Sequence, residues 1–350
     1  MKVCIYGAGA IGGYMAVLLK RSGVEVSLVA RGKHLAAIRE HGLKLVIDGK
    51  ERVERMPATD DPLELGPQDF VIVALKAHQA WEAAERMRPL LGPSTAVVTA
   101  QNGVPWWYFY RHGNEFEGTR LASVDPGDRQ WNAIGPERVL GCTVYPATEI
   151  VAPGVIRHIY GDRFGLGEPN RMFTDRLSRL SQMLRAAGLA PKVYEEIRDD
   201  IWIKLWGNLC FNPISVLTNA TLDVMATDPG VQTLVRHMML EAQEIGERFG
   251  IRFRVDVERR IAGAASVGAH RTSMLQDFDR KRPLELDALL KAVQEMGRIA
   301  DVSTPYIDTI WALVEQKARL YGLYPAYPDA ELGAPPAGCG RVRPQATAAV

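Results

Sequence analysis

A glycine-rich turn near the amino terminus is the feature that most constrains the fold of this chain. Residues 2–6 have the apolar composition of a buried strand, and the sequence Gly-Ala-Gly-Ala-Ile-Gly follows at 7–12. A helical pattern closed by Gly23 and a second strand over 24–30 come next. This order of strand, turn, helix and strand is typical of a dinucleotide-binding unit. An ordinary glycine-rich turn between strand and helix is the alternative.

Each glycine of the turn has a separate physical role. Gly7 permits the tight turn, Gly9 lets the backbone approach a pyrophosphate, and Gly12 lets the helix pack on the strand. The first N–H groups of the helix then face the phosphates. We therefore expect the cofactor to contact the whole turn, namely Gly7, Ala8, Gly9, Ala10, Ile11 and Gly12.

The residue after the second strand indicates which dinucleotide is bound. An NAD site places Asp or Glu there to hold the ribose hydroxyls. This chain has Arg31, with Lys33 close behind. Two cations suit a 2′-phosphate, so the sequence favours NADP(H). A solvated surface arginine is the alternative.

Two further apolar runs, over 70–75 and 95–100, are typical of parallel strands buried on both faces. The first is followed by Lys76 and the second by Asn102. Ligands of open α/β sheets gather beyond the carboxyl ends of the strands. Lys76 and Asn102 are therefore candidate cofactor residues, although each could be a simple cap or turn residue.

The remaining pattern predicts two domains and a tail. Strand-like runs within 120–168 are expected to complete the same sheet, followed by a helix over 173–188 and a strand over 190–194. From residue 196 the apolar spacing becomes helical. We predict an α/β fold in which a Rossmann-type parallel sheet domain (1–195) precedes an all-helical substrate domain (196–324). Residues 325–350 are expected to form a tail rich in proline, glycine and alanine.

Composition excludes several classes of function. The 350 residues contain 42 Lys and Arg against 41 Asp and Glu, so no basic excess suggests nucleic-acid binding. No run approaches the roughly 18 apolar residues of a membrane span. The 4 cysteines lack metal-ligand spacing, and no metal is expected. A cytoplasmic protein with a small-molecule partner is expected, and the helical domain would allow a homodimer.

A polar row interrupts the apolar segment 201–213. Lys204, Asn208 and Asn212 are spaced by four residues and so share one face of a helix. Asparagine is a mediocre helix former, which favours a pocket lining over a solvent-facing stripe. We expect Pro213 to end or kink the helix.

A second cluster lies between residues 271 and 285. Ser273 has Gln276 three residues on, which is a capping-box pattern. Pro283 fits a first helical position, which would place Glu285 in a first turn. For Ser273 and Asp277 these local roles are as well supported as functional ones.

Together these residues resemble the ketopantoate reductase (2-dehydropantoate 2-reductase) family. The matching motifs are GAGAIGG, the LKA around Lys76, QNG at 101–103, KLWGNLCFNP at 204–213, and SMLQD followed by Glu285. The resemblance implies NADPH-dependent reduction of 2-dehydropantoate to (R)-pantoate in pantothenate biosynthesis. It makes Lys204 the catalytic lysine and Glu285 the key glutamate. It also implies substrate contacts from Asn102, Asn208, Asn212, Ser273 and the supporting acid Asp277.

The chemistry of these residue types agrees with that reaction. Hydride transfer to a ketone leaves negative charge on oxygen, which Lys204 can stabilise and protonate. Glu285 could orient that ammonium or accept a substrate hydroxyl. The aromatic run 106–110 departs from expectation beside a small polar pocket. It predicts either buried packing or oligomer contact, or a pocket wall for a bulkier 2-keto acid. A non-catalytic NADP-binding regulator is a further alternative.

Overall fold

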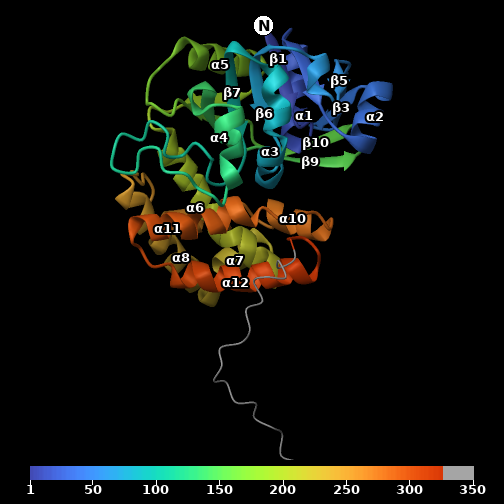
Figure 1. The fold of residues 1–350 in the computed structure, drawn as a ribbon. Helices are drawn as coiled ribbons and strands as arrows, with labels where there is room; N and C mark the ends of the chain where they lie inside the picture. Colours follow the sequence, from blue (N-terminus) through green and yellow to red (C-terminus); the bar gives the residue numbers. More distant parts are fainter. Residues whose placement is uncertain (326–350) are drawn as a thin grey trace, which may run out of the picture.

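The computed structural model describes residues 1–325 as a sheet domain followed by a helical domain (Figure 1). The predicted tail lies outside the described residues, apart from residue 325. The main sheet has the order β12-β11-β8-β7-β6-β1-β2-β5. Its strands are β1 (Lys2–Tyr6), β2 (Glu25–Val29), β5 (Ala58–Thr59), β6 (Gln68–Val73), β7 (Leu91–Ala100), β8 (Val139–Val144), β11 (Arg163–Gly167) and β12 (Ala190–Val193).

The centre of this sheet is parallel, as the apolar runs predict. β1 pairs in parallel with β2 and β6, and β7 pairs in parallel with β6 and β8. β11 runs antiparallel to β8. The helices of this domain are α1 (Ala10–Arg21), α2 (Gly32–His41), α3 (Ala77–Ala83), α4 (Arg129–Ala133) and α5 (Asp175–Ala186).

One strand expected in the main sheet belongs to a second sheet. β10 (Val155–Tyr160) pairs with β3 (Leu43–Ile47) and β9 (Ala147–Ala152), and β4 (Lys50–Glu54) completes the order β4-β3-β10-β9. The expectation of a single sheet over 120–168 was therefore wrong. The cause lies in α1, which is apolar and buried along residues 12–19 and needs cover on its outer face. Ile156 of β10 packs against Gly13, where a Cβ would lie 2.8 Å from its side chain.

The second domain is helical, and α10 and α11 lie on its side toward the sheet domain in Figure 1. Among the described residues its helices are α6 (Ile197–Thr218), α7 (Leu222–Thr227), α8 (Pro229–Arg248), α9 (Val257–Ala265), α10 (Ser273–Asp279), α11 (Ala292–Ala300) and α12 (Pro305–Leu320). A π-helical turn, Asp287–Lys291, precedes α11. None of the helices formed by residues 1–325 is long and apolar enough to cross a membrane.

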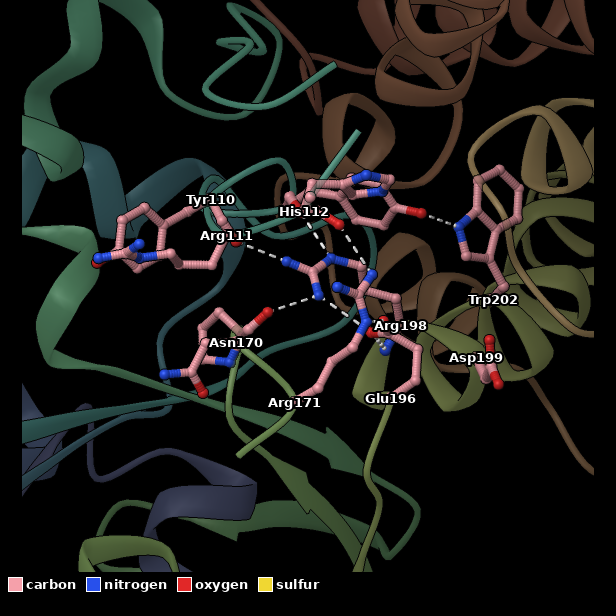
Figure 2. A network of polar contacts seen from close by, with 12 residues as sticks. Tyr110, Arg111, His112, Asn170, Arg171, Glu196, Arg198, Asp199 and Trp202 are labelled. Carbon is pink, nitrogen blue, oxygen red and sulfur yellow. Dashed lines mark hydrogen bonds and ion pairs between the residues drawn. The ribbon is translucent and has the colours of Figure 1, made fainter. Parts of the chain in front are cut away.

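The first turn of α6 is fixed by a fully buried arginine. Arg198 donates hydrogen bonds to the backbone carbonyls of Tyr108, Tyr110 and Pro169, at 2.7, 2.7 and 2.9 Å. It also forms an ion pair with Glu196 at 3.0 Å (Figure 2). These contacts tie the start of α6 to loops of the sheet domain.

The rest of α6 corrects one part of the prediction made for Pro213. The helix does not end there but continues to Thr218. Residues on both sides of Pro213 are buried in the core. Their packing offsets the hydrogen bond that proline cannot donate.

Candidate active site

A cleft of about 1040 Å³ runs between the two domains. Its walls come from the glycine turn, the carboxyl ends of the central strands, and helices α6, α9 and α10. Nearly every site residue suggested by the sequence lines it, including Arg31, Lys76, Asn102, Lys204, Asn208, Asn212, Ser273, Asp277 and Glu285. Positions up to about 280 residues apart in the chain therefore contribute to one site.

The glycine turn has the geometry that a pyrophosphate requires. Gly7 adopts φ +103°, a conformation favourable to glycine. A Cβ on Gly9 would meet nothing within 4 Å, so this position is open toward the cleft. Gly9 also begins α1 without a side-chain cap, which leaves first-turn N–H groups for a ligand. These residues fit a dinucleotide.

Gly12 lies behind the turn and is absent from the cleft wall. A Cβ there would lie 2.1 Å from the carbonyl oxygen of Gly7 and 2.8 Å from Ile5. Its role is the close packing of α1 on β1, as its place in the motif predicts.

Of the two cations Arg31 and Lys33, only Arg31 lines the cleft. Arg31 lines the cleft just beyond β2, is exposed, and forms no ion pair with the residues described. Lys33 is also exposed but lies outside the cleft wall. Arg86, which the sequence did not single out, lines the same end of the cleft and donates to the carbonyl of Asp60 at 2.6 Å.

Lys204 is held by neutral oxygens. Its Nζ donates to Asn102 Oδ1 at 2.7 Å and to the backbone carbonyl of Val144. An ammonium has three N–H donors, so one remains for a ligand in the cleft. Because burial disfavours the charged form and no carboxylate touches Nζ, the pKa of Lys204 is lowered to about 8.

Lys76 has the opposite environment. Its Nζ lies 2.7 Å from Glu285 Oε2 and 2.8 Å from Asp277 Oδ2. Burial favours the neutral amine, but the two carboxylates outweigh it and raise the pKa of Lys76. The bridge joins the start of α3, just after β6, to the helical domain.

Glu285 contacts Lys76 rather than Lys204. Its second oxygen accepts the backbone N–H of Ala77 at 3.0 Å. Burial opposes its charge, but Lys76 and this N–H lower the pKa of Glu285. A direct contact that orients the Lys204 ammonium, one of the two roles suggested for Glu285, is therefore not formed.

The asparagines of α6 follow Lys204 along the cleft. The side chain of Asn208 forms no hydrogen bond with the described part of the chain. Asn212 is 5% exposed, and its Nδ2 is buried without a partner. A buried amide without a partner is costly, which favours a ligand at this position. The polar row thus lines the cleft instead of facing bulk solvent.

Two local predictions in the carboxy-terminal cluster were wrong. Thr272, not Ser273, caps α10, since its hydroxyl accepts the N–H of Leu275. Ser273 occupies the first turn, exposed at the cleft, with no side-chain hydrogen bond within residues 1–325. Pro283 and Glu285 precede the next helix, whose first helical residue is Leu286. Glu285 is thereby placed by an extended segment beside Lys76.

The aromatic run does not line the main cleft. Trp106, Trp107, Tyr108 and Phe109 are buried, and the Trp107 indole donates to Thr99 at 3.0 Å. Tyr108 accepts a hydrogen bond from Trp202 of α6 at 2.6 Å. The buried-packing interpretation is correct for these four residues. Trp106 and Trp107 line only a small adjoining cavity, which also contacts Asn102 and Lys204.

Two supporting groups escaped sequence reasoning. Asp200, one turn before Lys204, accepts hydrogen bonds from Thr143 and Tyr145. His34 accepts the N–H of Gly154 on Nδ1 and so donates from Nε2 to the carbonyl of Ala8 at 2.7 Å. The only signal for Asp200 was its spacing of four from Lys204, and His34 gave none.

Comparison with known proteins agrees with this geometry. The family model described as "Ketopantoate reductase PanE/ApbA" matches residues 3–171, and its C-terminal counterpart matches residues 196–318. The chain belongs to the ketopantoate reductase family. A 2-dehydropantoate 2-reductase of Mesorhizobium japonicum is 54% identical over 93% of this chain and 100% of its own length.

Solved structures of the family have the same fold. A protein assigned to the ketopantoate reductases of Ralstonia solanacearum MolK2 superposes with a TM-score of 0.88 at 44% identity, covering 92% of this chain and 99% of its own. The 2-dehydropantoate 2-reductase of Geobacter metallireducens gives 0.79 at 28%, covering 91% and 100%. D-mandelate dehydrogenase with NADH and anilino(oxo)acetate gives 0.79 at 22% identity, covering 92% and 100%, and shares the fold.

Proposed function

We propose that this chain reduces 2-dehydropantoate to (R)-pantoate with NADPH. The observation that carries the proposal is the environment of Lys204: a buried ammonium with one uncommitted N–H donor in a cleft that begins at a dinucleotide-binding turn. Family membership and the name of the Mesorhizobium relative support the same substrate.

The turn at residues 7–11 would hold the coenzyme, because the open Gly9 lets the backbone approach the pyrophosphate and the free N–H groups of α1 can donate hydrogen bonds to it. When bound, it supplies the hydride that reduces the keto carbon. Arg31 supports NADPH over NADH, because its free guanidinium lies where an NAD site needs a carboxylate.

Lys204 acts on the keto oxygen. Its third N–H donates a hydrogen bond to that oxygen, and the interaction strengthens as negative charge develops there. The proton moves from Nζ to the new alkoxide, which gives the hydroxyl of pantoate and a neutral amine. Water then returns a proton to Nζ. A pKa of about 8 suits this general acid, because it is mostly protonated at neutral pH and still releases its proton readily.

The other cleft residues position the reactants. Asn102 fixes the Lys204 ammonium, while Asn208 and Asn212 offer amides to polar groups of the substrate. Glu285, held by Lys76, presents a carboxylate that can accept a substrate hydroxyl. A regulator that only bound the coenzyme would have no use for a lysine kept buried at an energetic cost.

A spectrophotometric assay tests the proposal. NADPH oxidation is followed with 2-dehydropantoate and with a panel of other 2-keto acids, aromatic ones included. We expect 2-dehydropantoate to have the highest kcat/KM and Lys204→Ala to lose turnover by orders of magnitude while binding NADPH normally. No oxidation with any 2-keto acid would rule out a reductase, and preference for an aromatic acid would change the substrate.

The same assay tests the coenzyme. We expect NADPH to be preferred over NADH, and Arg31→Ala to lower kcat/KM for NADPH without lowering it for NADH. Lys33→Ala is the matched control, because this exposed lysine lies outside the cleft. A preference for NADH in the unaltered protein would contradict the role given to Arg31.

A further inference from the structure

Arg260 is another cation that lines the cleft, and it packs against the part of α6 that carries Lys204. Arg260 of α9 donates from Nε to the backbone carbonyl of Ile203 at 3.3 Å. Its guanidinium lies on α6 at Gly207, where a Cβ would be only 2.0 Å from Nη2. Glycine in a helix interior costs about 1 kcal/mol relative to alanine. The space it leaves for Arg260 explains why glycine is tolerated here.

Arg260 has no anionic partner among residues 1–325. The hydrogen bond to Ile203 uses one of the five N–H donors of a guanidinium. The ionisable groups that interact electrostatically with Arg260 are Tyr145 and Cys210. Burial raises the pKa of both, so both are neutral at pH 7. A half-buried cation without a counter-charge is unfavourable unless a ligand supplies one.

The position of Arg260 matches the shape of a 2-keto acid. Ile203 and Gly207 lie on the row of α6 next to the row of Lys204 and Asn208, within a single turn. All five residues line the same cleft. A 2-keto acid carries its carboxylate on the carbon bonded to the carbonyl, so the two groups need neighbouring donors.

We propose that Arg260 binds the substrate carboxylate while Lys204 binds the adjacent keto oxygen. This inference rests on the proposed function and assigns a specificity-determining residue to it. A guanidinium can hold a carboxylate through two parallel N–H donors, which fixes the orientation of the keto carbon. The exposed hydroxyl of Ser273 can add a neutral hydrogen bond but cannot balance the charge.

Steady-state kinetics of Arg260→Gln test the assignment. We expect KM for 2-dehydropantoate to rise about ten- to a hundredfold, the usual effect of losing a hydrogen bond to a charged group, with little change in NADPH affinity. Arg259→Gln is the matched control, since Arg259 is the neighbouring residue of α9, exposed and paired only with Asp256. Thermal unfolding of both variants checks that they fold.

Two further arms make the test specific. The uncharged carboxamide of the substrate should be reduced equally well by the unaltered protein and by Arg260→Gln. Gly207→Ala should raise KM for the acid by displacing the guanidinium, without lowering the melting temperature by more than a few degrees.

Several results would overturn the assignment: an unchanged KM in Arg260→Gln, equal losses for acid and carboxamide, or a loss of NADPH binding instead. A larger effect of Arg163→Gln would do the same, because Arg163 also lines the cleft, stacked 3.6 Å from the Tyr145 ring. If the unaltered protein reduced no 2-keto acid, the proposed function itself would fail.

Discussion

The rate of keto-acid reduction should fall at alkaline pH because Lys204 must carry its proton to act as the acid. With a pKa of about 8, Lys204 is about nine-tenths protonated at pH 7, about one-tenth at pH 9 and about one-hundredth at pH 10. We therefore expect kcat/KM for 2-dehydropantoate to reach a plateau below pH 7 and to fall tenfold per pH unit above about pH 8.

The environment of Lys204 predicts how this alkaline limb can be moved. Burial is the main cause of the lowered pKa of Lys204. The carboxylates of Asp200 and Glu285 act against it, and the charge of Arg163 adds to it. Asn102→Asp places a carboxylate at the oxygen that now lies 2.7 Å from Nζ. An opposite charge at that distance raises a lysine pKa by about 1–3 units, so the limb should move to higher pH by that amount.

The assay is the pH dependence of kcat/KM from pH 6 to about pH 10.5, with a deuterated coenzyme to establish that hydride transfer limits the rate. Gln101→Glu is a control for the added charge, because Gln101 binds the carbonyl of Leu75 rather than Lys204. A flat profile through pH 10, or a limb that stays in place in an active Asn102→Asp variant, would refute the role of Lys204 as the proton donor.

Three other variants test the surrounding structure. Glu285→Gln removes a charge that raises the pKa of Lys204, so the alkaline limb should shift to lower pH and kcat/KM should fall about tenfold or more; an unshifted limb would contradict the coupling. Arg198→Met leaves buried carbonyls unpaired and should lower the free energy of unfolding in urea by about 3–5 kcal/mol, whereas the exposed Arg254→Met should change it by less than about 1 kcal/mol. Lys204→Met removes the titration of this lysine. Because the pKa of Lys204 is lower in the folded than in the unfolded protein, the stability of the unaltered protein relative to this variant should rise by about 3 kcal/mol between about pH 7 and pH 10.5. A constant difference would mean that the pKa is not lowered.

The sequence predicted the parts of the fold that depend on local composition. The runs 70–75 and 95–100 are mostly apolar because these parts of β6 and β7 are buried on both faces, as is typical of central parallel strands. The second sheet was missed because β3 and β4 are short and partly exposed, so their alternation is weak. Its existence depends on the outer face of α1, which is a property of the packed structure.

The site shows a similar division. The row of Lys204, Asn208 and Asn212 was visible because three polar residues at helical spacing stood out in an apolar segment. The pairing of Lys76 with Glu285 joins residues 209 positions apart, which local sequence does not reveal. The cap of α10 is Thr272 rather than the adjacent Ser273, because the helical backbone begins directly after Thr272. No sequence signal pointed to Arg260, because it follows another arginine in a polar stretch. The role proposed for it depends on the contact between α9 and Gly207, which only the structure shows.

The two lysines of the cleft show how one side chain serves two purposes at one site. Lys76 lies between two carboxylates, which raise its pKa and keep it charged at every physiological pH. It can bridge the domains but is a poor proton donor, because losing its proton would leave two buried carboxylates without a counter-charge. Lys204 contacts only neutral oxygens, so burial lowers its pKa to about 8 and release of its proton costs little. The partners of each ammonium therefore favour Lys204 over Lys76 as the proposed acid of the reaction.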